Sequence, residues 1–433
     1  MAYARSDRLP LERASKLGHM RVIQEPLVQR LLDAFERVEE GEDDSCGEVT
    51  GRLDLAQVGE LENVVAIDGS SVAVPNALRS YRQLAFITFG AVCLSRTEMN
   101  AMKAHPIVDP RDLAARLQDQ TYGRPAVLPL SGVGVPGQTV SSTMRRTVDE
   151  TLRSTGLYAT LRFLVSREWQ ADYDMVEHMA CIACGEEIRL PRHALAFRCV
   201  GCGEHHTLAD YLSLVHSPPD DWATAEAARG LRDILETLLL MHFLRVYRDR
   251  PVILSRTLFV KDGPLLLRAQ LERLVPPIRA FLQFLRESGR AIHVIGIEKN
   301  GDLVDHVPLI QKAIPEPGDY FLPTVRYLHE RIHGVPFCAA TYRNRVQYGA
   351  KAVVRLGPQH VVAVNVPTGE FLTEPQVDDL YGFEPSMAAL ADMLSYAHEN
   401  ALIPVVLANA SLSISLTPST DILEEFAKRL LGE

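Results

Sequence analysis

The distribution of apolar and polar positions along the chain predicts an α/β protein. Short apolar runs between polar turns indicate strands, and longer segments with an apolar residue every three or four positions indicate helices. After residue 220 the two patterns alternate, which is typical of helices packed on a sheet. We expect strands at 62–69, 83–94, 251–263 and 291–299, a β-hairpin at 350–367, and helices at 140–165, 223–249, 265–289 and 385–403.

The same pattern divides the chain into four parts. Residues 1–50 are expected to form a helical lead-in followed by an acidic linker, and 174–212 to form a small insertion. The segments 51–173 and 213–433, on either side of the insertion, are expected to form two parts of one core. No repeat of fixed period is visible, which argues against a solenoid or a propeller.

Composition sets limits on location and on partners. The chain has 433 residues, of which 47% are hydrophobic, but it has no run of eighteen apolar residues, so we expect no membrane span. Its first residues lack the apolar stretch of a secretory signal, so the cytoplasm is the expected location. The net charge of −10 argues against a generic nucleic-acid coat protein, but not against a nuclease, whose catalytic acids add to the negative total. Arg outnumbers Lys 38 to 7; guanidinium groups suit phosphate, although a biased genomic base composition gives the same excess.

Four of the seven cysteines form one group with metal-ligand spacing. Cys181 and Cys184 make one CxxC pair, and Cys199 and Cys202 make another, with 14 residues between the pairs. Two such turns close a tetrahedral site for Zn²⁺, and because four ligands leave no open position, the zinc is expected to be structural. An iron–sulfur cluster or metal-free thiols are the alternatives. The neighbours His205 and His206 could compete as ligands, but we expect them to be solvated loop residues.

Two aspartates are expected to end strands of the sheet. Asp68 follows the apolar run "VVAI", and Asp262 follows "TLFVK"; a glycine comes after each. If the strands are adjacent and end alike, the two carboxylates meet at the carboxyl edge of the sheet, where open α/β sheets place their ligands. Close carboxylates repel each other, and a divalent cation removes that repulsion. Asp-Gly is also a common turn dipeptide, so either residue alone has a purely structural interpretation.

Two further candidates lie on predicted helices. Glu236 is the single acid in a helical segment that is apolar nearly all round, and a lone buried carboxylate is costly unless it is paired or bound to a metal. Pairing with Arg232 is its structural alternative. His398 shares a predicted stripe with apolar residues of the 385–403 helix, so it is expected to point inward, either as a ligand or as a core histidine. Asp392 and Glu399 are spare ligand candidates nearby.

Four motifs, in this order and spacing, resemble the NurA family of nucleases: "VVAIDGSS", "FVKDGPL", "VIGIEKNG" and "YAHENALI". The resemblance covers roughly residues 55–415. It implies an RNase H-like mixed sheet flanked by helices, and cleavage of DNA with Mn²⁺ or Mg²⁺. It also implies a HerA-type hexameric ATPase as partner, a homodimer, and a role in DNA end processing or antiviral defence.

The resemblance also implies roles for individual residues. A two-metal mechanism uses hard oxygen ligands, which favour Mg²⁺ or Mn²⁺ over zinc at the catalytic centre. Two departures stand out: Pro264 replaces a serine that is usual after the second motif, and the cysteine insertion is not a feature of the common form. Carried over motif by motif, the catalytic and metal-binding residues are Asp68, Glu236, Asp262 and His398, and the substrate-binding residues are Ser70 and Lys299.

Two other functions fit the same residues. The chain could be a catalytically inactive adaptor, with a zinc ribbon on a nuclease-like fold, that binds DNA or docks the ATPase. It could also be an RNase H-like enzyme that acts on RNA. Cleavage polarity and the choice between single and double strands leave no signal in the sequence.

Overall fold

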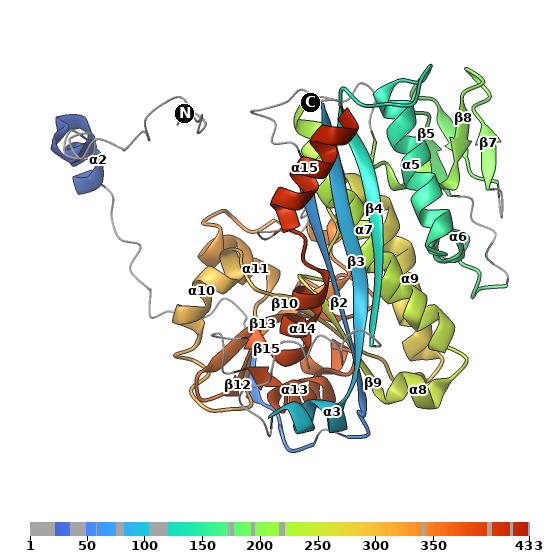
Figure 1. The fold of residues 1–433 in the computed structure, drawn as a ribbon. Helices are drawn as coiled ribbons and strands as arrows, with labels where there is room; N and C mark the ends of the chain where they lie inside the picture. Colours follow the sequence, from blue (N-terminus) through green and yellow to red (C-terminus); the bar gives the residue numbers. More distant parts are fainter. Residues whose placement is uncertain are drawn as a thin grey trace. The chain divides into compact units, whose positions relative to one another are not determined.

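A computed structural model describes most of the chain, and its residues fall into two units. It describes residues 22–34, 49–57, 59–74, 82–103, 120–171, 173, 177–191, 195–215, 221–338, 343–395, 401–415 and 419–431. The first unit, Met1–Ser45, contributes helix α2 (Pro26–Ala34), which lies within the predicted lead-in. The second unit, Cys46–Glu433, holds every other element described below (Figure 1).

Nine strands of the described residues form one mixed sheet in the second unit. The spatial order is β1-β11-β12-β13-β10-β9-β2-β3-β4. The strand β2 pairs antiparallel with β3, and β3 pairs antiparallel with β4, whereas β9 lies parallel to both β2 and β10. The strands are β1 (Val49–Arg52), β2 (Asn63–Val74), β3 (Gln83–Ser95), β4 (Thr121–Ser131), β9 (Thr257–Asp262), β10 (His293–Glu298), β11 (Asp319–Leu322), β12 (Gly349–Gly357) and β13 (His360–Pro367).

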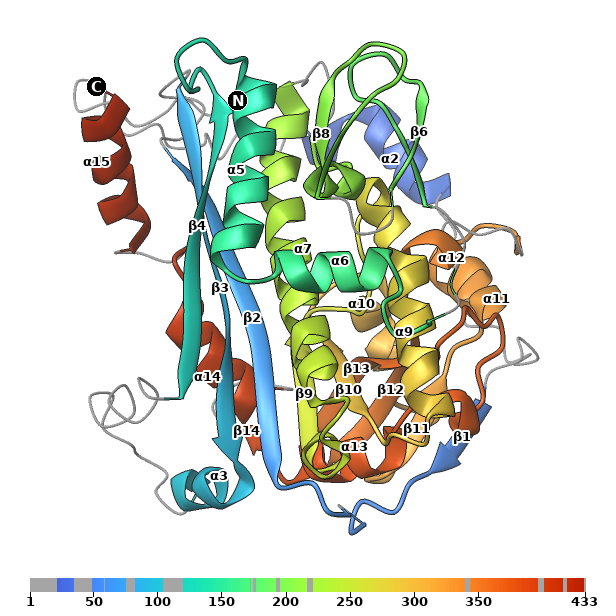
Figure 2. The ribbon, with the colours of Figure 1, turned by 90° about the vertical axis from the view of Figure 1, so that its right-hand side faces the viewer.

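Helices cover both faces of the sheet, because alternate residues of its central strands point to opposite faces. Ile67 and Phe259 belong to one core cluster, which also contains residues of α7. Ala66 and Val260 belong to a second cluster, which contains residues of α13 and α14. Figure 2 shows α5, α6, α7 and α9 gathered on the first face. The helices are α5 (Val140–Ser154), α6 (Tyr158–Val165), α7 (Asp221–Tyr247), α9 (Val275–Glu287), α13 (Phe383–Ala391) and α14 (Ile403–Leu412).

The remaining elements surround this core. A third cluster packs α10 against β11 and β12. No helix in the described part of the chain combines the length and the hydropathy that crossing a bilayer requires. These elements are α3 (Arg96–Lys103), α8 (Pro251–Ser255), η2 (Ala269–Leu274), α10 (Asp302–Ile310), α11 (Val325–Tyr327), η3 (Leu328–Ile332), α12 (Arg343–Val346), η4 (Val377–Asp379) and α15 (Ser419–Leu431).

The insertion forms two small hairpins, each of which carries one CxxC pair. The strands β5 (His178–Ala180) and β6 (Glu187–Arg189) make the first hairpin, and β7 (Ala196–Arg198) and β8 (His205–Thr207) make the second. The short helix η1 (Leu208–Leu212) then leads back toward the core.

Three predictions of secondary structure need correction. The helix expected at 265–289 is shorter, because residues 269–274 form the 3₁₀ helix η2 and α9 begins at Val275. Residues 385–403 do not form one helix: α13 ends at Ala391, and a hairpin of β14 (Leu394–Ser395) and β15 (Ala401–Leu402) precedes α14. Pro404, in the first turn of α14, suits a helix start and not a helix interior. His398 and Glu399 lie outside the described residues. The predicted strand at 251–263 starts as the helix α8, and only its second half is β9, whereas the hairpin at 350–367 is confirmed as β12–β13.

Candidate functional site

Asp68 lies on β2 at the point where the parallel strand β9 ends. The pairing of β2 with β9 ends at Ile67 and Lys261, so Asp68 comes next to Asp262, the last residue of β9. The prediction that the first strand ends at Asp68 is wrong, because β2 continues to Val74. Its partner β3 runs beside it for that whole length and keeps its backbone groups paired.

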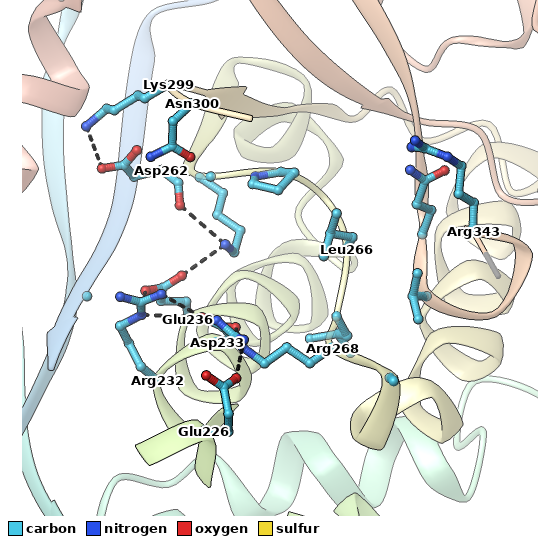
Figure 3. Close-up of a pocket in the computed structure, with 18 of the residues that line it drawn as sticks. Glu226, Arg232, Asp233, Glu236, Asp262, Leu266, Arg268, Lys299, Asn300 and Arg343 are labelled. Carbon is cyan, nitrogen blue, oxygen red and sulfur yellow. Dashed lines mark hydrogen bonds and ion pairs between the residues drawn. The ribbon is translucent and has the colours of Figure 1, made fainter. Parts of the chain in front are cut away.

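The two aspartates line a cavity of about 1320 Å³ together with three other predicted site residues. Its walls come from β2, α7, the segment after β9, the loop after β10, the segment from η3 to α12, and the end of α14 with the residues after it. Figure 3 shows Glu236 and Asp262 on the same side of this cavity, with Arg343 on the other. The predicted residues that line it are Asp68, Ser70, Glu236, Asp262 and Lys299.

Asp68 is a buried carboxyl group in a negative environment. Its side chain accepts a hydrogen bond of 2.7 Å from the backbone N–H of Gly69, and the residue is 7% exposed. Burial, and then the charges of Asp262 and Glu236, raise the pKa of Asp68 to about 7. A cation at this position removes the repulsion, so the donor set suits a hard divalent metal ion.

Lysines pair with the other two acids in this structure. Lys299 Nζ lies 2.6 Å from Asp262 Oδ2, and Lys261 Nζ lies 2.9 Å from Glu236 Oε2. Lys299 is partly exposed, whereas Lys261 is buried in the cavity wall. Sequence reasoning missed Lys261, although a single charge inside the apolar run "TLFVK" was a visible signal.

Glu236 uses both of its carboxylate oxygens. Besides the bond to Lys261, its Oε1 lies 3.4 Å from Arg232 Nε, so the structural alternative considered for Glu236 is present in the fold. Burial raises the pKa of Glu236, and the charges of Lys261 and Arg232 oppose that rise. Gly69 makes this position of Glu236 possible, because a Cβ atom on Gly69 would lie 2.7 Å from Glu236 Oε1. The role of Glu236 as a metal ligand stays a prediction.

The pairing continues as a ladder of alternating charges along α7. Arg232 lies 2.9 Å from Asp233, which in turn lies 2.8 Å from Arg268. Arg268 also lies 2.6 Å from Glu226. Because Arg268 belongs to the segment after β9, this ladder ties that segment to the helix.

Two further predicted residues have structural partners. Ser70 accepts a hydrogen bond of 3.2 Å from the backbone N–H of Ile414, so its hydroxyl group holds the segment after α14 against β2. Asp392, a spare ligand candidate, forms an ion pair with Arg96 and is not part of the cavity wall. Contact of Ser70 with a substrate stays a prediction.

The four cysteines of the insertion meet at one point. Their sulfur atoms all lie within 4.8 Å of one another, and two pairs, Cys181–Cys202 and Cys184–Cys199, are 3.6 Å apart. Four sulfurs bound to one zinc at about 2.3 Å stand about 3.8 Å apart, so this group could hold a metal ion such as zinc. In the described part of the chain no other group of three or more His, Cys, Asp or Glu side chains is as closely spaced, and this includes Asp68, Glu236 and Asp262.

The two histidines after the second pair differ in environment. His205 is exposed, as expected, but the expectation of a solvated His206 is wrong because His206 is fully buried. Its Nε2 lies 3.3 Å from Cys181 Sγ. The sequence carries no signal that separates these adjacent histidines beyond their alternation in β8, which turns one side chain inward and the other outward.

Comparisons with known proteins give little further information. No family model matches the chain, and no curated protein matches it. Among solved structures, a crystal structure of NurA is similar over 96% of this chain and 97% of its own, with 11% sequence identity and a TM-score of 0.28. A similarity of this size does not establish a shared fold.

Proposed function

We propose that this chain is a divalent-metal-dependent nuclease with an RNase H-like core, and that it hydrolyses phosphodiester bonds of DNA in the cytoplasm. The observation that carries the proposal is the meeting of Asp68 and Asp262 on adjacent parallel strands, at the wall of a large polar cavity. The four sequence motifs that resemble the NurA nucleases support the choice of reaction and substrate.

The strand order supports the architecture. A three-stranded antiparallel meander, β2-β3-β4, is extended from its first strand by two parallel strands, β9 and β10. This order brings residues 194 positions apart in sequence to neighbouring places, which an RNase H-like centre requires.

The residues of the cavity have distinct parts in the proposed reaction. When bound, Mg²⁺ or Mn²⁺ supplies Lewis-acid stabilisation of the phosphate and a more acidic water. Asp68 and Asp262 provide hard oxygen ligands, and Asp68 must give up its proton to do so. Lys299, which reaches Asp262 from the exposed side, is placed to contact a phosphate oxygen beside that carboxylate. Glu236 either completes the ligand set or holds Lys261, and His398 is the proposed fourth ligand or proton carrier.

One observation favours the second candidate, an inactive adaptor on the same fold. Asp262 and Glu236 are each paired with a lysine, and the three acids are not as closely spaced as the cysteines. If these pairs persist in the presence of metal ions, the cavity cannot hold a catalytic ion and the chain acts through binding alone.

Incubation of the purified chain with linear DNA separates the two candidates. We expect cleavage with Mn²⁺ that stops with EDTA and is lost in Asp68→Ala and Asp262→Ala, whereas the exposed-site control Asp378→Ala cleaves normally. Intact DNA under all conditions, with the wild-type chain folded, would contradict the proposal. Parallel RNA substrates test the remaining alternative.

The resemblance adds two partners to the proposal, a HerA-type hexameric ATPase and a second copy of the chain. Light scattering after gel filtration tests the homodimer, and a strict monomer at micromolar concentration would contradict it. Co-elution with a HerA-type hexamer, compared with the chain alone, tests the ATPase. Neither result alters the test of cleavage, because that test uses the purified chain.

A further inference from the structure

The cysteine centre has a fifth potential ligand, the imidazole of His206. Its Nε2 lies 3.3 Å from Cys181 Sγ, and the side chain is fully buried. Imidazole nitrogen is a common zinc ligand, and sites with three cysteines and one histidine are as ordinary as sites with four cysteines. A nitrogen this close to a ligand sulfur could replace that sulfur as a ligand with little movement of the protein.

The surroundings of His206 resemble those of a metal-bound histidine. A ligating histidine usually directs its second ring nitrogen to a carboxylate, which orients the ring. Here Nδ1 lies 3.4 Å from Asp210 Oδ2, but it makes no hydrogen bond among the described residues. In the tautomer with the proton on Nδ1, the nitrogen nearer this carboxylate, the lone pair of Nε2 is directed toward the cysteines. Phe197 stacks on the ring, with centroids 5.7 Å apart and planes at 16°.

Asp210 is itself held by the core of the protein. Arg145 of α5 donates two hydrogen bonds to its carboxylate, at 2.8 and 2.7 Å, and a third of 2.9 Å to Glu204. Asp210 also accepts a hydrogen bond from the backbone N–H of Thr207. Contacts therefore run from Cys181 through His206 and Asp210 to Arg145, and they connect the imidazole to the core of the protein.

The second hairpin offers a matched comparison. Cys181 and Cys199 are both the first cysteine of their pair, both 3% exposed, and both accept a backbone hydrogen bond from a glycine after the pair, Gly185 or Gly203. Cys199, however, has the exposed carboxylate of Glu186 at 4.0 Å in place of an imidazole. The two hairpins therefore place their cysteines alike, but only Cys181 has an imidazole nitrogen beside its sulfur.

We infer that His206 is a reserve ligand of the zinc centre, able to take the place of Cys181 so that the ion is then held by three cysteines and one histidine. The inference does not depend on the proposed nuclease activity, because it concerns only the cysteine centre. It assigns a metal-binding role to a residue outside the CxxC pairs.

The test measures zinc in the full-length chain. Wild type, Cys181→Ala, Cys199→Ala and Cys181→Ala/His206→Ala are purified with zinc and titrated with a chromogenic chelator. We expect Cys181→Ala to retain one zinc per chain and to bind it at least about tenfold more tightly than Cys199→Ala or the double variant. Equal zinc loss in Cys181→Ala and Cys199→Ala would overturn the inference, as would equal retention in Cys181→Ala and the double variant.

A spectroscopic measurement identifies the replacing ligand. With Co²⁺ in place of zinc, Cys181→Ala should keep the visible absorption bands of a tetrahedral site. The absorbance of its thiolate charge-transfer band should fall by the contribution of one sulfur ligand. In the double variant the tetrahedral bands should weaken or disappear. Tetrahedral bands that are identical in both variants would show that water, and not His206, fills the fourth position. Circular dichroism of each variant checks that the core sheet is folded.

Discussion

The crowding of acids around Asp68 predicts that the candidate active site destabilises the metal-free protein. The fold raises the pKa of Asp68 from 3.8 to about 7, chiefly through burial and the charge of Asp262. Between these pH values the folded chain binds more protons than the unfolded chain, so stability is lost as pH rises through this window. Replacement of Asp68 by Asn removes the ionisation and keeps an oxygen that can accept the hydrogen bond from Gly69.

The size of the effect follows from the shift. A rise in pKa from 3.8 to about 7 lowers the free energy of unfolding by about 4 kcal/mol above pH 7 and by little below pH 4. Unfolding entropy for a unit of nearly 400 residues is about 0.8 kcal/mol/K. With EDTA present at pH 8, Asp68→Asn should therefore melt about 5 °C higher than wild type, and the difference should shrink toward zero at pH 4.

The assay is differential scanning fluorimetry from pH 4 to 8, with and without Mn²⁺. Mn²⁺ should raise the melting temperature of wild type at pH 8 but not that of Asp68→Asn, and the exposed-site control Asp378→Asn should follow wild type throughout. An Asp68→Asn chain that is no more stable than wild type at pH 8 in EDTA would refute the reasoning, because Asp68 would then not be a strained carboxylate.

Three further predictions concern single contacts. Gly69→Ala should lower the free energy of unfolding by about 1–3 kcal/mol in urea titrations, because the new Cβ would lie 2.7 Å from Glu236 Oε1 and 3.0 Å from the Thr88 carbonyl oxygen. The control Gly123→Ala, whose Cβ would meet only Leu412 Cδ2 at 3.3 Å, should lower it less, and the reverse order would contradict the geometry. Lys261→Met should lower the free energy of unfolding by about 3–5 kcal/mol, because it leaves Glu236 buried without its closest partner, and Lys261→Met/Glu236→Leu should recover much of that loss. A double variant as unstable as the single one would show that the ion pair is not the cause. Removal of zinc by a strong chelator should expose residues 177–212 to limited proteolysis, because the hairpins of the insertion have strands of only three residues each. The circular dichroism of the sheet should change little, and an insertion that stays protease-resistant without metal would contradict this prediction.

Sequence patterns gave the neighbourhood of the site but not its details. The two Asp-Gly motifs predict two strands that end in an acid, but the pairing of β2 with β9 comes from the structure alone. The continuation of β2 past Asp68 was not predictable from "DGSS", since a glycine and two serines also form turns. That continuation depends on β3, whose apolar run 83–94 was recognised without its register.

Long-range pairing explains the other failures. The segment 385–403 has helical spacing, but α13 ends at Ala391 and the strands β14 and β15 pair before α14 begins. The pairing of Lys261 is not predictable because its partner Glu236 is 25 residues away on another element, and an ion pair between a strand and a helix leaves no periodic signal. The cysteine pairs were predictable because all four ligands lie in two short local turns, whereas the buried position of His206 depends on Asp210 and on Arg145 of α5.

The ladder along α7 leaves the cavity electrically balanced. The cavity wall carries five basic side chains, at positions 232, 261, 268, 299 and 343, and five acidic ones, at positions 68, 226, 233, 236 and 262, of which Asp68 is only partly ionised near pH 7. A polyanion approaching such a surface gains little attraction from the protein alone. Divalent ions would make the cavity positive, so metal and nucleic acid should each strengthen the binding of the other. The metal-free chain should therefore bind nucleic acid weakly.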